Sequence, residues 1–331
     1  EKWNLDKEVI AELLLSTKQK LDIITESMDV FNSLTESQSE AYVYWQEGAF
    51  RSQYKKNDAK LEVSIHSSPV DTGIVLSKYL FPKIDSIILT SATLKVDESF
   101  EYFLNRSGIG KLKDKNIQYA TCSSPFFYSD QVSYHQYSGD KSLSENPMAI
   151  AEVIFKCYKK LNQKILVLFT AYSSLSKVTH CLSTLRGGKE LPVFSQTQRS
   201  SRYALIEGMA QSKNGILMGT SSFWEGIDLS GEMLEILIIT KLPFQVPSDP
   251  IVKAYSESLA QNNVNSFLEF TVPECILKYR QGFGRLIRTS YDQGIFINLD
   301  NRIVTKRYGK QFQDAIPVNM KMFSTLDSLI L

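Results

Sequence analysis

Hydrophobic residues recur at three- and four-residue steps over residues 5–34, the spacing that places them on one face of a helix. Residues 61–66 alternate between apolar and polar, as a strand with one buried face does. A short helix is expected at 71–81, after Pro69. The next run, 84–90, is apolar, β-branched and short, which is typical of a central parallel strand covered on both faces.

From residue 147 the pattern alternates regularly between helical periodicity and short apolar runs. Alternation of this density predicts a parallel sheet with helices on both faces, and the sequence contains no internal repeat. Residues 95–145 are less regular, with a helix expected at 100–104 and an aromatic, loop-rich stretch at 119–138. The expected helices of the regular part are 147–161, 175–185, 199–209, 250–261 and 264–283, and its expected strands are 165–170, 193–195, 216–219, 234–240 and 295–299.

The composition is that of an ordinary globular protein, with 43% hydrophobic and 22% charged residues. A length of 331 residues suggests about two domains. The net charge of +1 gives no overall basic field, so a bound polyanion would need a local groove. Aromatic and basic residues mix at 35–60, a composition that can stack on single-stranded nucleic acid or form ordinary aromatic packing with a solvated rim.

The four cysteines are widely spaced and form no CxxC pair, so the sequence shows no ligand set for zinc or for an iron–sulfur cluster. Single thiols fit a reducing, cytoplasmic setting. No apolar run approaches the roughly 18 residues of a membrane span, and no signal peptide is visible. The chain starts at Glu1 without Met, so we expect it to be a piece of a longer protein.

Two arginines, Arg285 and Arg288, stand three residues apart in the stretch 281–288, which we call the arginine segment. We expect them to close a helix that runs from Pro273, where residues i and i+3 share a face. Two guanidiniums on one face form a fork for phosphate, because arginine stays charged and binds oxyanions bidentately. The alternative is a helix end with two solvated arginines favoured by the helix dipole.

Polar residues follow the expected strands, at the end where ligands gather in open α/β sheets. After the run 84–90, Ser91 and Thr93 could relay hydrogen bonds or cap the next helix. After the strand 165–170, the turn 170–174 could hold a phosphate at a helix N-terminus or serve as a plain N-cap.

The stretch 220–229 follows a third expected strand and packs two carboxylates, three hydroxyls, a glycine and two aromatics together. Carboxylates in a polar loop are usually solvated, so Glu225 and Asp228 alone are weak indicators. Combined with Arg285 and Arg288, they suggest one composite site, with hydroxyls for a backbone, acids for a ribose or a coupling contact, and arginines for a phosphoryl group.

A phosphate-binding glycine loop ending in Gly-Lys-Ser/Thr is missing from the sequence. The nearest candidates, 107–112 and 187–190, lack both the first glycine and the hydroxyl residue after the lysine, and we interpret them as ordinary turns. No apolar strand ends in an Asp-Glu pair that could hold magnesium. The chain could therefore supply one wall of a nucleotide site, but not the wall that grips the triphosphate.

The order of these segments resembles the helicase motifs of the DinG/XPD branch of superfamily 2, and the resemblance covers about residues 61 to 309. Ser-Ala-Thr-Leu resembles motif III, Phe-Thr-Ala-Tyr-Ser-Ser motif IV, Gly-Thr-Ser-Ser-Phe-Trp-Glu-Gly-Ile-Asp-Leu motif V, and Gln-Gly-Phe-Gly-Arg-Leu-Ile-Arg motif VI. These motifs, with the family-specific Leu-Pro-Phe-Gln-Val-Pro-Ser-Asp-Pro, stand at 91–94, 169–174, 219–229, 281–288 and 242–250.

The resemblance implies an α/β fold: a RecA-like helicase motor domain with a parallel sheet and flanking helices, preceded by a helical segment. Residues 1–60 would be the helical tail of an inserted, arch-like domain, 61–95 the end of motor domain 1, and 96–331 motor domain 2. Motifs I and II are absent, so the chain would be an incomplete ATPase. The iron–sulfur cysteines of many relatives would lie upstream, leaving no cluster in this chain.

The resemblance also implies residue roles. The catalytic residues, reaching the γ-phosphate of ATP, would be Arg285, Arg288 and Gln281. Facing the nucleotide and coupling it to DNA would be Glu225, Gly226, Asp228, Gly284, Ser91 and Thr93. The backbone of single-stranded DNA would be contacted by Thr170, Ser173, Gln196, Thr220 and Ser221. ATP and Mg²⁺ would be held mainly by the missing motor domain, and this chain would hold no metal.

The implied activity is that of the C-terminal part of an ATP-dependent 5′–3′ DNA helicase, in which two RecA-like domains close on each other to ratchet the strand. Its partners would be single-stranded DNA and the rest of the parent chain, with no membrane. In some Gram-positive relatives the motor is fused to an exonuclease. The alternative is therefore an ATP-responsive DNA-binding module that regulates a fused 3′–5′ exonuclease without unwinding.

Overall fold

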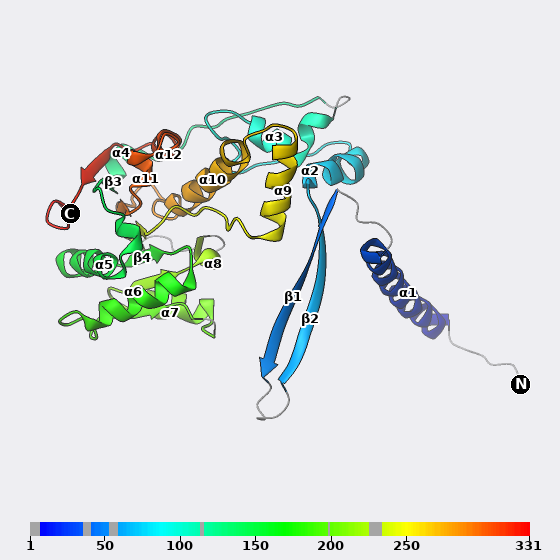
Figure 1. Cartoon of the computed structure of the whole chain (residues 1–331), viewed down its shortest axis with the longest axis horizontal. Coiled ribbons are helices and arrows are strands. Elements are labelled where there is room, and N and C mark those ends of the chain that lie inside the picture. Colours follow the sequence, from blue (N-terminus) through cyan, green and yellow to red (C-terminus); the bar gives the residue numbers. More distant parts are fainter. Residues whose placement is uncertain (1–6, 36–40, 53–58, 113–115, 198, 225–233) are drawn as a thin grey trace, which may run out of the picture. The chain divides into compact units, whose positions relative to one another are not determined.

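The computed structural model describes residues 7–35, 41–52, 59–112, 116–197, 199–224 and 234–331 (Figure 1). The chain forms two compact units. The small unit combines Glu1–Lys83, Arg106–Ile109 and Val246–Val264. The large unit combines Ile84–Asn105, Gly110–Gln245 and Asn265–Leu331, so the run 84–90 and the residues that follow it belong to the large unit.

The small unit contains a long helix and a β-hairpin. Helix α1 (Lys7–Thr35) confirms the periodicity at 5–34. Strand β2 (Ala59–Pro69) contains the expected strand 61–66, and it pairs antiparallel with β1 (Tyr42–Ser52). Strand β1 was not predicted, because its aromatic and polar residues carry no clear alternation. The segment before the sheet is thus a helix plus a hairpin, and not helical throughout.

Two further helical segments complete the small unit. The helix expected at 71–81 begins as α2 (Thr72–Val75), capped by the Asp71 carboxylate, and continues as a π-helical turn, Leu76–Leu80, and a 3₁₀ turn, Phe81–Lys83. Helix α9 (Pro250–Gln261) starts at the carboxylate of Asp249, which accepts hydrogen bonds from two backbone N–H groups.

The large unit contains a seven-stranded sheet in the order β5-β6-β4-β7-β8-β3-β9, and the six pairings are all parallel. Five of these strands confirm the alternation seen in the sequence. The other two, β3 and β9, were not predicted, and β3 lies inside the stretch 119–138 that was expected to be loop-rich. The strands are β3 (Val132–Tyr137), β4 (Ile165–Leu168), β5 (Val193–Ser195), β6 (Ile216–Gly219), β7 (Ile236–Ile239), β8 (Gly294–Asn298) and β9 (Met320–Phe323).

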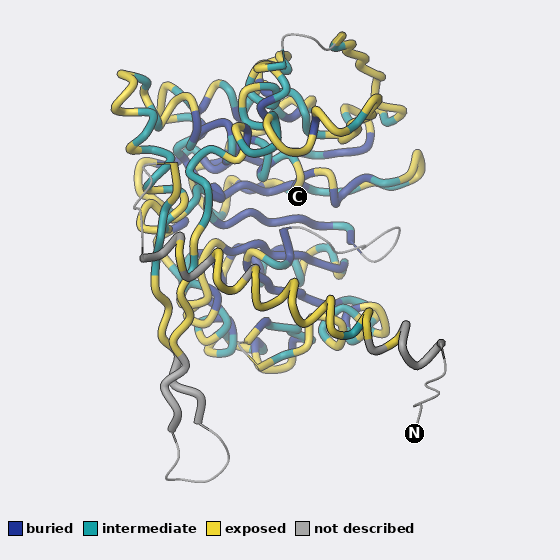
Figure 2. Tube along the Cα trace, turned by 90° about the vertical axis from the view of Figure 1, so that its right-hand side faces the viewer, coloured by how far each residue is buried: buried dark blue, intermediate teal, exposed yellow. Residues whose placement is uncertain are grey.

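Helices cover both faces of this sheet, and alternate strand residues enter two separate cores. On one face, Leu166 and Leu168 of β4 share a core with α7, α10 and α12; on the other, Ile165 and Val167 share a core with α5 and α6. Strands β4, β6 and β7 are buried along their whole length, and buried strands are dark blue in Figure 2. The expected α/β class with a parallel sheet and flanking helices is confirmed. The bounds are α5 (Pro147–Leu161), α6 (Tyr172–Thr184), α7 (Arg202–Gln211), α10 (Val272–Phe283) and α12 (Gly309–Asp314).

Several short helical segments connect these elements. A π-helical turn precedes α10, so the helix expected at 264–283 is divided into two parts. The short segments are α3 (Glu101–Ser107), Ile109–Lys111, α4 (Tyr128–Gln131), Leu143–Glu145, α8 (Ser221–Trp224), Phe267–Thr271 and α11 (Arg302–Thr305). Of the helices that the structure describes, none combines the length and hydropathy that crossing a membrane requires.

The run 84–90 is not a strand in this chain, contrary to the prediction from its composition. Its side chains are exposed instead of covered: Ile88 is 87% exposed and Ile87 is 46% exposed. An apolar run becomes a central strand only where neighbouring strands satisfy its backbone N–H and C=O groups. Among the strands described here, none pairs with it.

Candidate functional site

The two arginines of the arginine segment do not close helix α10. The helix ends at Phe283, and the chain turns through Gly284, with Arg285 N–H bonded to the carbonyl oxygen of Gly282. Arg285 and Arg288 therefore lie beyond the helix, and the prediction that they share a helical face is wrong. A glycine is needed at position 282 for close packing, because a Cβ atom there would lie 2.9 Å from Cζ3 of Trp224.

Arg285 is buried, and its guanidinium holds the backbone of Trp224. Nε and Nη2 donate to the Trp224 carbonyl oxygen at 3.0 and 2.5 Å. The indole Nε1 of Trp224 in turn donates to the carbonyl oxygen of Phe169 at 3.0 Å. The segments that follow β4, β6 and α10 therefore meet at one residue, and three of the motif-bearing stretches are brought together.

Arg288 is half-buried in a loop that Asp292 organises. The Asp292 carboxylate accepts hydrogen bonds from the N–H groups of Arg288 and Thr289, at 2.8 and 2.9 Å, and from the Thr289 hydroxyl at 2.7 Å. Desolvation acts to raise the pKa of Asp292, but these hydrogen bonds outweigh it and hold the pKa below its ordinary value. Partial burial lowers the pKa of Arg288, and the neighbouring carboxylate opposes that shift.

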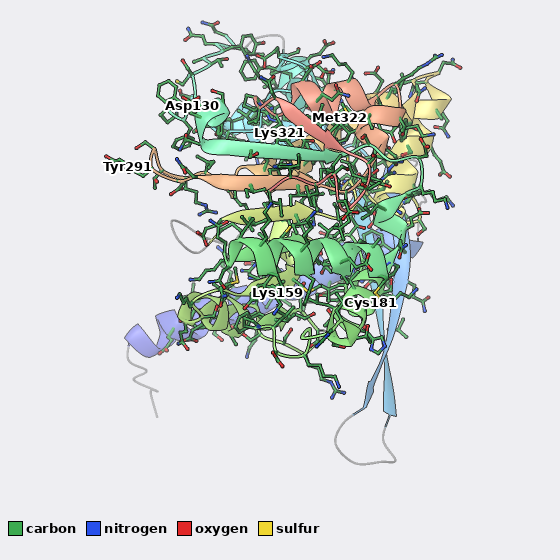
Figure 3. All side chains as sticks on the ribbon, turned by 90° about the vertical axis from the view of Figure 1, so that its left-hand side faces the viewer. Asp130, Lys159, Cys181, Tyr291, Lys321 and Met322 are labelled. Atoms are coloured by element: carbon green, nitrogen blue, oxygen red, sulfur yellow. The ribbon has the colours of Figure 1, made fainter. Side chains whose placement is uncertain are left out.

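This loop lies at the edge of the sheet where β3 and β8 begin. Gln131, which precedes β3, donates from Nε2 to the carbonyl oxygens of Thr289 and Asp292 at 3.0 and 2.8 Å. Figure 3 shows Tyr291 of the same loop on that side of the sheet, near Asp130. Arg288 thus lies in the loop that precedes β8, whereas Arg285, three residues earlier, contacts Trp224 in the segment that follows β6.

The carboxyl edge of the sheet is organised by the side chain of Gln196, which is 8% exposed. Its Oε1 accepts hydrogen bonds from the N–H and hydroxyl of Thr220, at 2.7 and 3.0 Å. Its Nε2 donates to the Tyr172 hydroxyl at 2.8 Å and to Ser222 Oγ at 2.9 Å. We call these four residues the Gln196 cluster. Four hydrogen bonds fill the capacity of the amide, so Gln196 positions its neighbours.

Three of the expected DNA-contact residues are exposed at this edge, whereas Thr220 and Gln196 are buried. The exposed ones are Thr170, Ser173 and Ser221. Beside them is a groove of about 630 Å³ that is rich in hydroxyl groups. Its lining residues include Tyr172, Ser173, Ser176, Thr179, His180 and Gln196.

Sequence reasoning missed a basic and aromatic group next to this groove. Arg199, Arg202 and Tyr203 are exposed in the segment that enters α7, and Tyr203 is 75% exposed. Nη1 of Arg202 donates to the carbonyl oxygen of Ser222 at 3.2 Å, which places it against the segment after β6. The signal was available in the sequence, because bases interleaved with aromatics are typical of single-strand binding.

Ser91 and Thr93 form a local turn instead of capping a helix. The two hydroxyl oxygens lie 3.3 Å apart, and the N–H of Thr93 donates to Ser91 Oγ at 3.2 Å. The next helix, α3, has its own polar N-terminal partner, Ser99, which accepts from the N–H of Glu101. The turn lies against α10, because Nη1 of Arg280 donates to the Lys95 carbonyl oxygen at 2.7 Å.

The remaining expected residues are placed as follows. Gln281 and Gly284 are exposed at the end of α10. Glu225, Gly226 and Asp228 lie outside the described residues.

Burial raises the pKa of the Cys157 thiol to about 12 and that of Cys275 well above its ordinary value, so both thiols are core residues. Within the described ranges, no group of three or more His, Cys, Asp or Glu side chains could hold a metal ion.

Residues 154–319 match the protein family described as the helicase C-terminal domain. The chain is 34% identical over 265 residues to the 3′-5′ exonuclease DinG of Bacillus subtilis (strain 168), covering 78% of this chain and 28% of that protein. It is 31% identical over 323 residues to the ATP-dependent DNA helicase YoaA of Haemophilus influenzae, covering 96% of this chain and 47% of that protein. The chain thus spans less than half the length of these relatives.

Among solved structures, the chain is similar to an XPD helicase with a TM-score of 0.58 and 21% identity, over 80% of this chain and 47% of that one. A second structure, described as XPD apo, gives the same TM-score of 0.58 at 18% identity, over 97% of this chain and 63% of that one. These likenesses show the fold. With the family match and the DinG and YoaA relatives, they show that the chain belongs to the DinG-like superfamily 2 helicases, as a C-terminal portion of such a protein.

Proposed function

We propose that this chain is the second motor domain, with adjoining segments, of an ATP-dependent DNA helicase of 5′–3′ polarity. The observation that carries the proposal is the pair of hydrogen bonds from Arg285 to the Trp224 carbonyl oxygen. They join the arginine segment to the stretch that continues into Glu225 and Asp228. The contact thereby attaches the segment expected to bind a phosphoryl group to the end of α8, which follows strand β6.

The two arginines would have different roles. Arg285 is buried and engaged with backbone, so it fixes the geometry of the segment. Arg288 is half-buried in a loop ordered by Asp292, and its guanidinium is the better candidate for the γ-phosphate of ATP. Gln281 and Gly284, which precede Arg288 in the chain, are exposed and would shape its contact with the γ-phosphate. ATP, held with Mg²⁺ by a preceding motor domain, would supply the phosphoryl group that Arg288 stabilises.

The exposed run 84–90 supports the existence of that preceding domain. Its composition is that of a central strand, yet the described part of the chain offers it no pairing partner. The relatives named above are more than twice as long as the part they share with this chain. Both facts fit a run that completes the sheet of a first motor domain.

Single-stranded DNA would bind at the carboxyl edge of the sheet. Thr170, Ser173 and Ser221 offer hydroxyls for phosphate oxygens, as many protein–DNA contacts do. Arg199 and Arg202 supply charge, and Tyr203 offers an exposed ring on which a base can stack. Because the net charge of the whole chain is only +1, this local basic group matters more than any global field.

A second candidate is an ATP-responsive DNA-binding module that controls an attached nuclease without unwinding. The observation that favours it is the relative from Bacillus subtilis, which is named a 3′-5′ exonuclease and is 34% identical over 265 residues. The same arginines and the same DNA edge would serve this role, with ATP changing nuclease activity instead of driving strand separation.

The test uses the full-length protein that contains this chain and measures DNA-stimulated ATP hydrolysis and unwinding. Arg288→Ala is expected to lower kcat by about 10³–10⁵, the contribution of an arginine finger, while sparing DNA binding. Arg186→Ala, an exposed arginine at the end of α6, is the matched control and should retain activity. Turnover that survives Arg288→Ala contradicts the assignment. ATP-dependent nuclease activity without unwinding would establish the second candidate.

A further inference from the structure

Arg280, in the last turn of α10, binds the backbone of the turn that follows the run 84–90, and we call this contact the clamp. Its Nη1 donates to the Lys95 carbonyl oxygen at 2.7 Å, and its Nη2 donates to the Ala92 carbonyl oxygen at 3.4 Å. These carbonyls stand three residues apart, on either side of Thr93. One planar guanidinium binds both acceptors at once, each through a different terminal nitrogen.

The chain just beyond this turn is anchored by other contacts. Val96 is buried in the core that contains α10, and the Tyr102 hydroxyl donates to Glu274 of α10 at 2.5 Å. Nε2 of Gln311 donates to the Asp97 carboxylate at 2.8 Å. Arg280 extends this attachment upstream to Ala92, inside the Ser91–Thr93 turn. The clamp therefore reaches the backbone between the two hydroxyl residues, and not only the connection that follows them.

We infer that Arg280 is a positioning residue that sets the Ser91–Thr93 turn against the start of the arginine segment. The inference rests on the function proposed above. Arg280 directly precedes Gln281, so the clamp attaches the turn to the helix residue next to the exposed glutamine at the end of α10. The position of Arg285 on Trp224 is fixed from the same helix end. A movement of the turn is thereby passed to the segment that carries the arginines.

This role predicts a specific kinetic effect. Arg280 is committed to backbone carbonyls and does not serve as a nucleotide ligand, so its loss should lower kcat in the presence of DNA and leave KM for ATP unchanged. Loss of charge-assisted hydrogen bonds of this kind corresponds to roughly tenfold in an equilibrium, and a kcat decrease of about tenfold is expected. Arg280→Lys should recover part of it, because the charge remains but the planar guanidinium with its separated donors is lost.

The first measurement is hydrogen–deuterium exchange at residues 91–97 in the full-length protein, which does not depend on activity. Arg280→Gln should accelerate exchange there by about tenfold. Lys278→Gln, which removes a charge from the same helix, should leave it unchanged. Unaltered exchange in Arg280→Gln would contradict the clamp. This outcome is independent of the proposed function, because it can be measured whether or not the protein hydrolyses ATP.

The second measurement is DNA-stimulated ATPase in the same proteins, with a double-mutant cycle. If Arg280 acts through the turn, Arg280→Gln and Ser91→Ala should be non-additive, so that the double variant is little slower than the slower single variant. Additive losses, or an unchanged kcat despite faster exchange at 91–97, would refute the positioning role. An unchanged melting temperature in Arg280→Gln separates the effect from general destabilisation.

Discussion

Arg285 and Trp224 are joined by two hydrogen bonds from one buried guanidinium to one carbonyl oxygen, at 3.0 and 2.5 Å. The residues stand 61 positions apart in the chain. The contact holds the last described residue of α8 against the turn that follows α10. An arginine that resembles a phosphate ligand in the sequence is therefore also a backbone anchor in the fold.

The first prediction concerns this anchor. Arg285→Ala should lower the free energy of unfolding by about 1–3 kcal/mol, because the buried carbonyl oxygen of Trp224 loses both of its donors. Urea denaturation measures the change, and Arg186→Ala should stay within about 0.5 kcal/mol of the wild type as an exposed arginine. A stable Arg285→Ala protein with lost ATPase would instead make Arg285 a direct ligand.

The two glycines of the arginine segment should respond differently to alanine. Gly282→Ala places a Cβ atom 2.9 Å from the Trp224 ring, so we expect a loss of stability of about 1–3 kcal/mol. At Gly284 the nearest atom would be 3.4 Å away and φ is −61°, so Gly284→Ala should be neutral or slightly stabilising. Equal melting temperatures for the two variants would contradict the packing of Trp224 against α10.

Gln196 and Ser221 separate positioning from contact at the DNA edge. Gln196→Ala leaves several partners of the Gln196 cluster unsatisfied, so stability should fall by about 1–3 kcal/mol and affinity for single-stranded DNA should fall with it. Ser221→Ala removes an exposed hydroxyl and should weaken DNA binding at unchanged stability. Thermal unfolding and fluorescence anisotropy with an oligonucleotide give the two readouts. Weaker binding by Gln196→Ala at full stability would mean that its amide contacts DNA directly.

Tyr203 tests the missed basic and aromatic group. Tyr203→Ala should weaken binding of an unstructured single strand by about 1–3 kcal/mol, the usual contribution of one stacked base, and Tyr203→Phe should retain it. Tyr291 is the matched control, because it is 93% exposed but lies at the opposite edge of the sheet. If Tyr291→Ala weakens binding as much as Tyr203→Ala, the DNA path is not at the carboxyl edge.

Asp292 gives a pH dependence with a definite sign. Its pKa is below the ordinary value in the folded chain, so it contributes stability above the unfolded pKa of about 4, and this contribution disappears as the pH falls through the lower folded pKa. Asp292→Asn should therefore be less stable than the wild type at neutral pH, with the difference shrinking in acid. Urea titrations across that range measure it, and a difference that grows on acidification would contradict the loop geometry.

The regular part of the fold was predictable because β4 to β8 are apolar runs separated by amphipathic helices. Strand β3 was not, since its buried face includes polar residues such as Gln136, which bonds the Asn298 amide and the Asp300 carbonyl oxygen from far along the chain. Hydropathy cannot distinguish such a strand from a loop. The prediction for the run 84–90 was wrong for the opposite reason. Its composition is that of a strand, but pairing depends on neighbouring strands that the described chain does not offer.

The candidate site was predictable as a set of residues and not as a geometry. Polar residues after apolar strands indicated the carboxyl edge, and the Gln196 cluster lies there. The sequence could not reveal that Gln196 is fully engaged, since its partners stand 24 and 26 residues away. The sequence could not reveal the role of Arg280 either, because its acceptors are backbone carbonyls nearly two hundred residues upstream. Every residue has a backbone carbonyl, so residue type does not indicate such an acceptor.

The exposed run 84–90 has a practical consequence for anyone who purifies this chain alone. An extended apolar stretch with open backbone edges is a template for intermolecular strand pairing. Ile87, Ile88 and Leu89 face solvent here, so concentrated samples should associate through this stretch. Solubility would then improve on restoring the upstream sheet, and charged substitutions on distant surfaces would help much less.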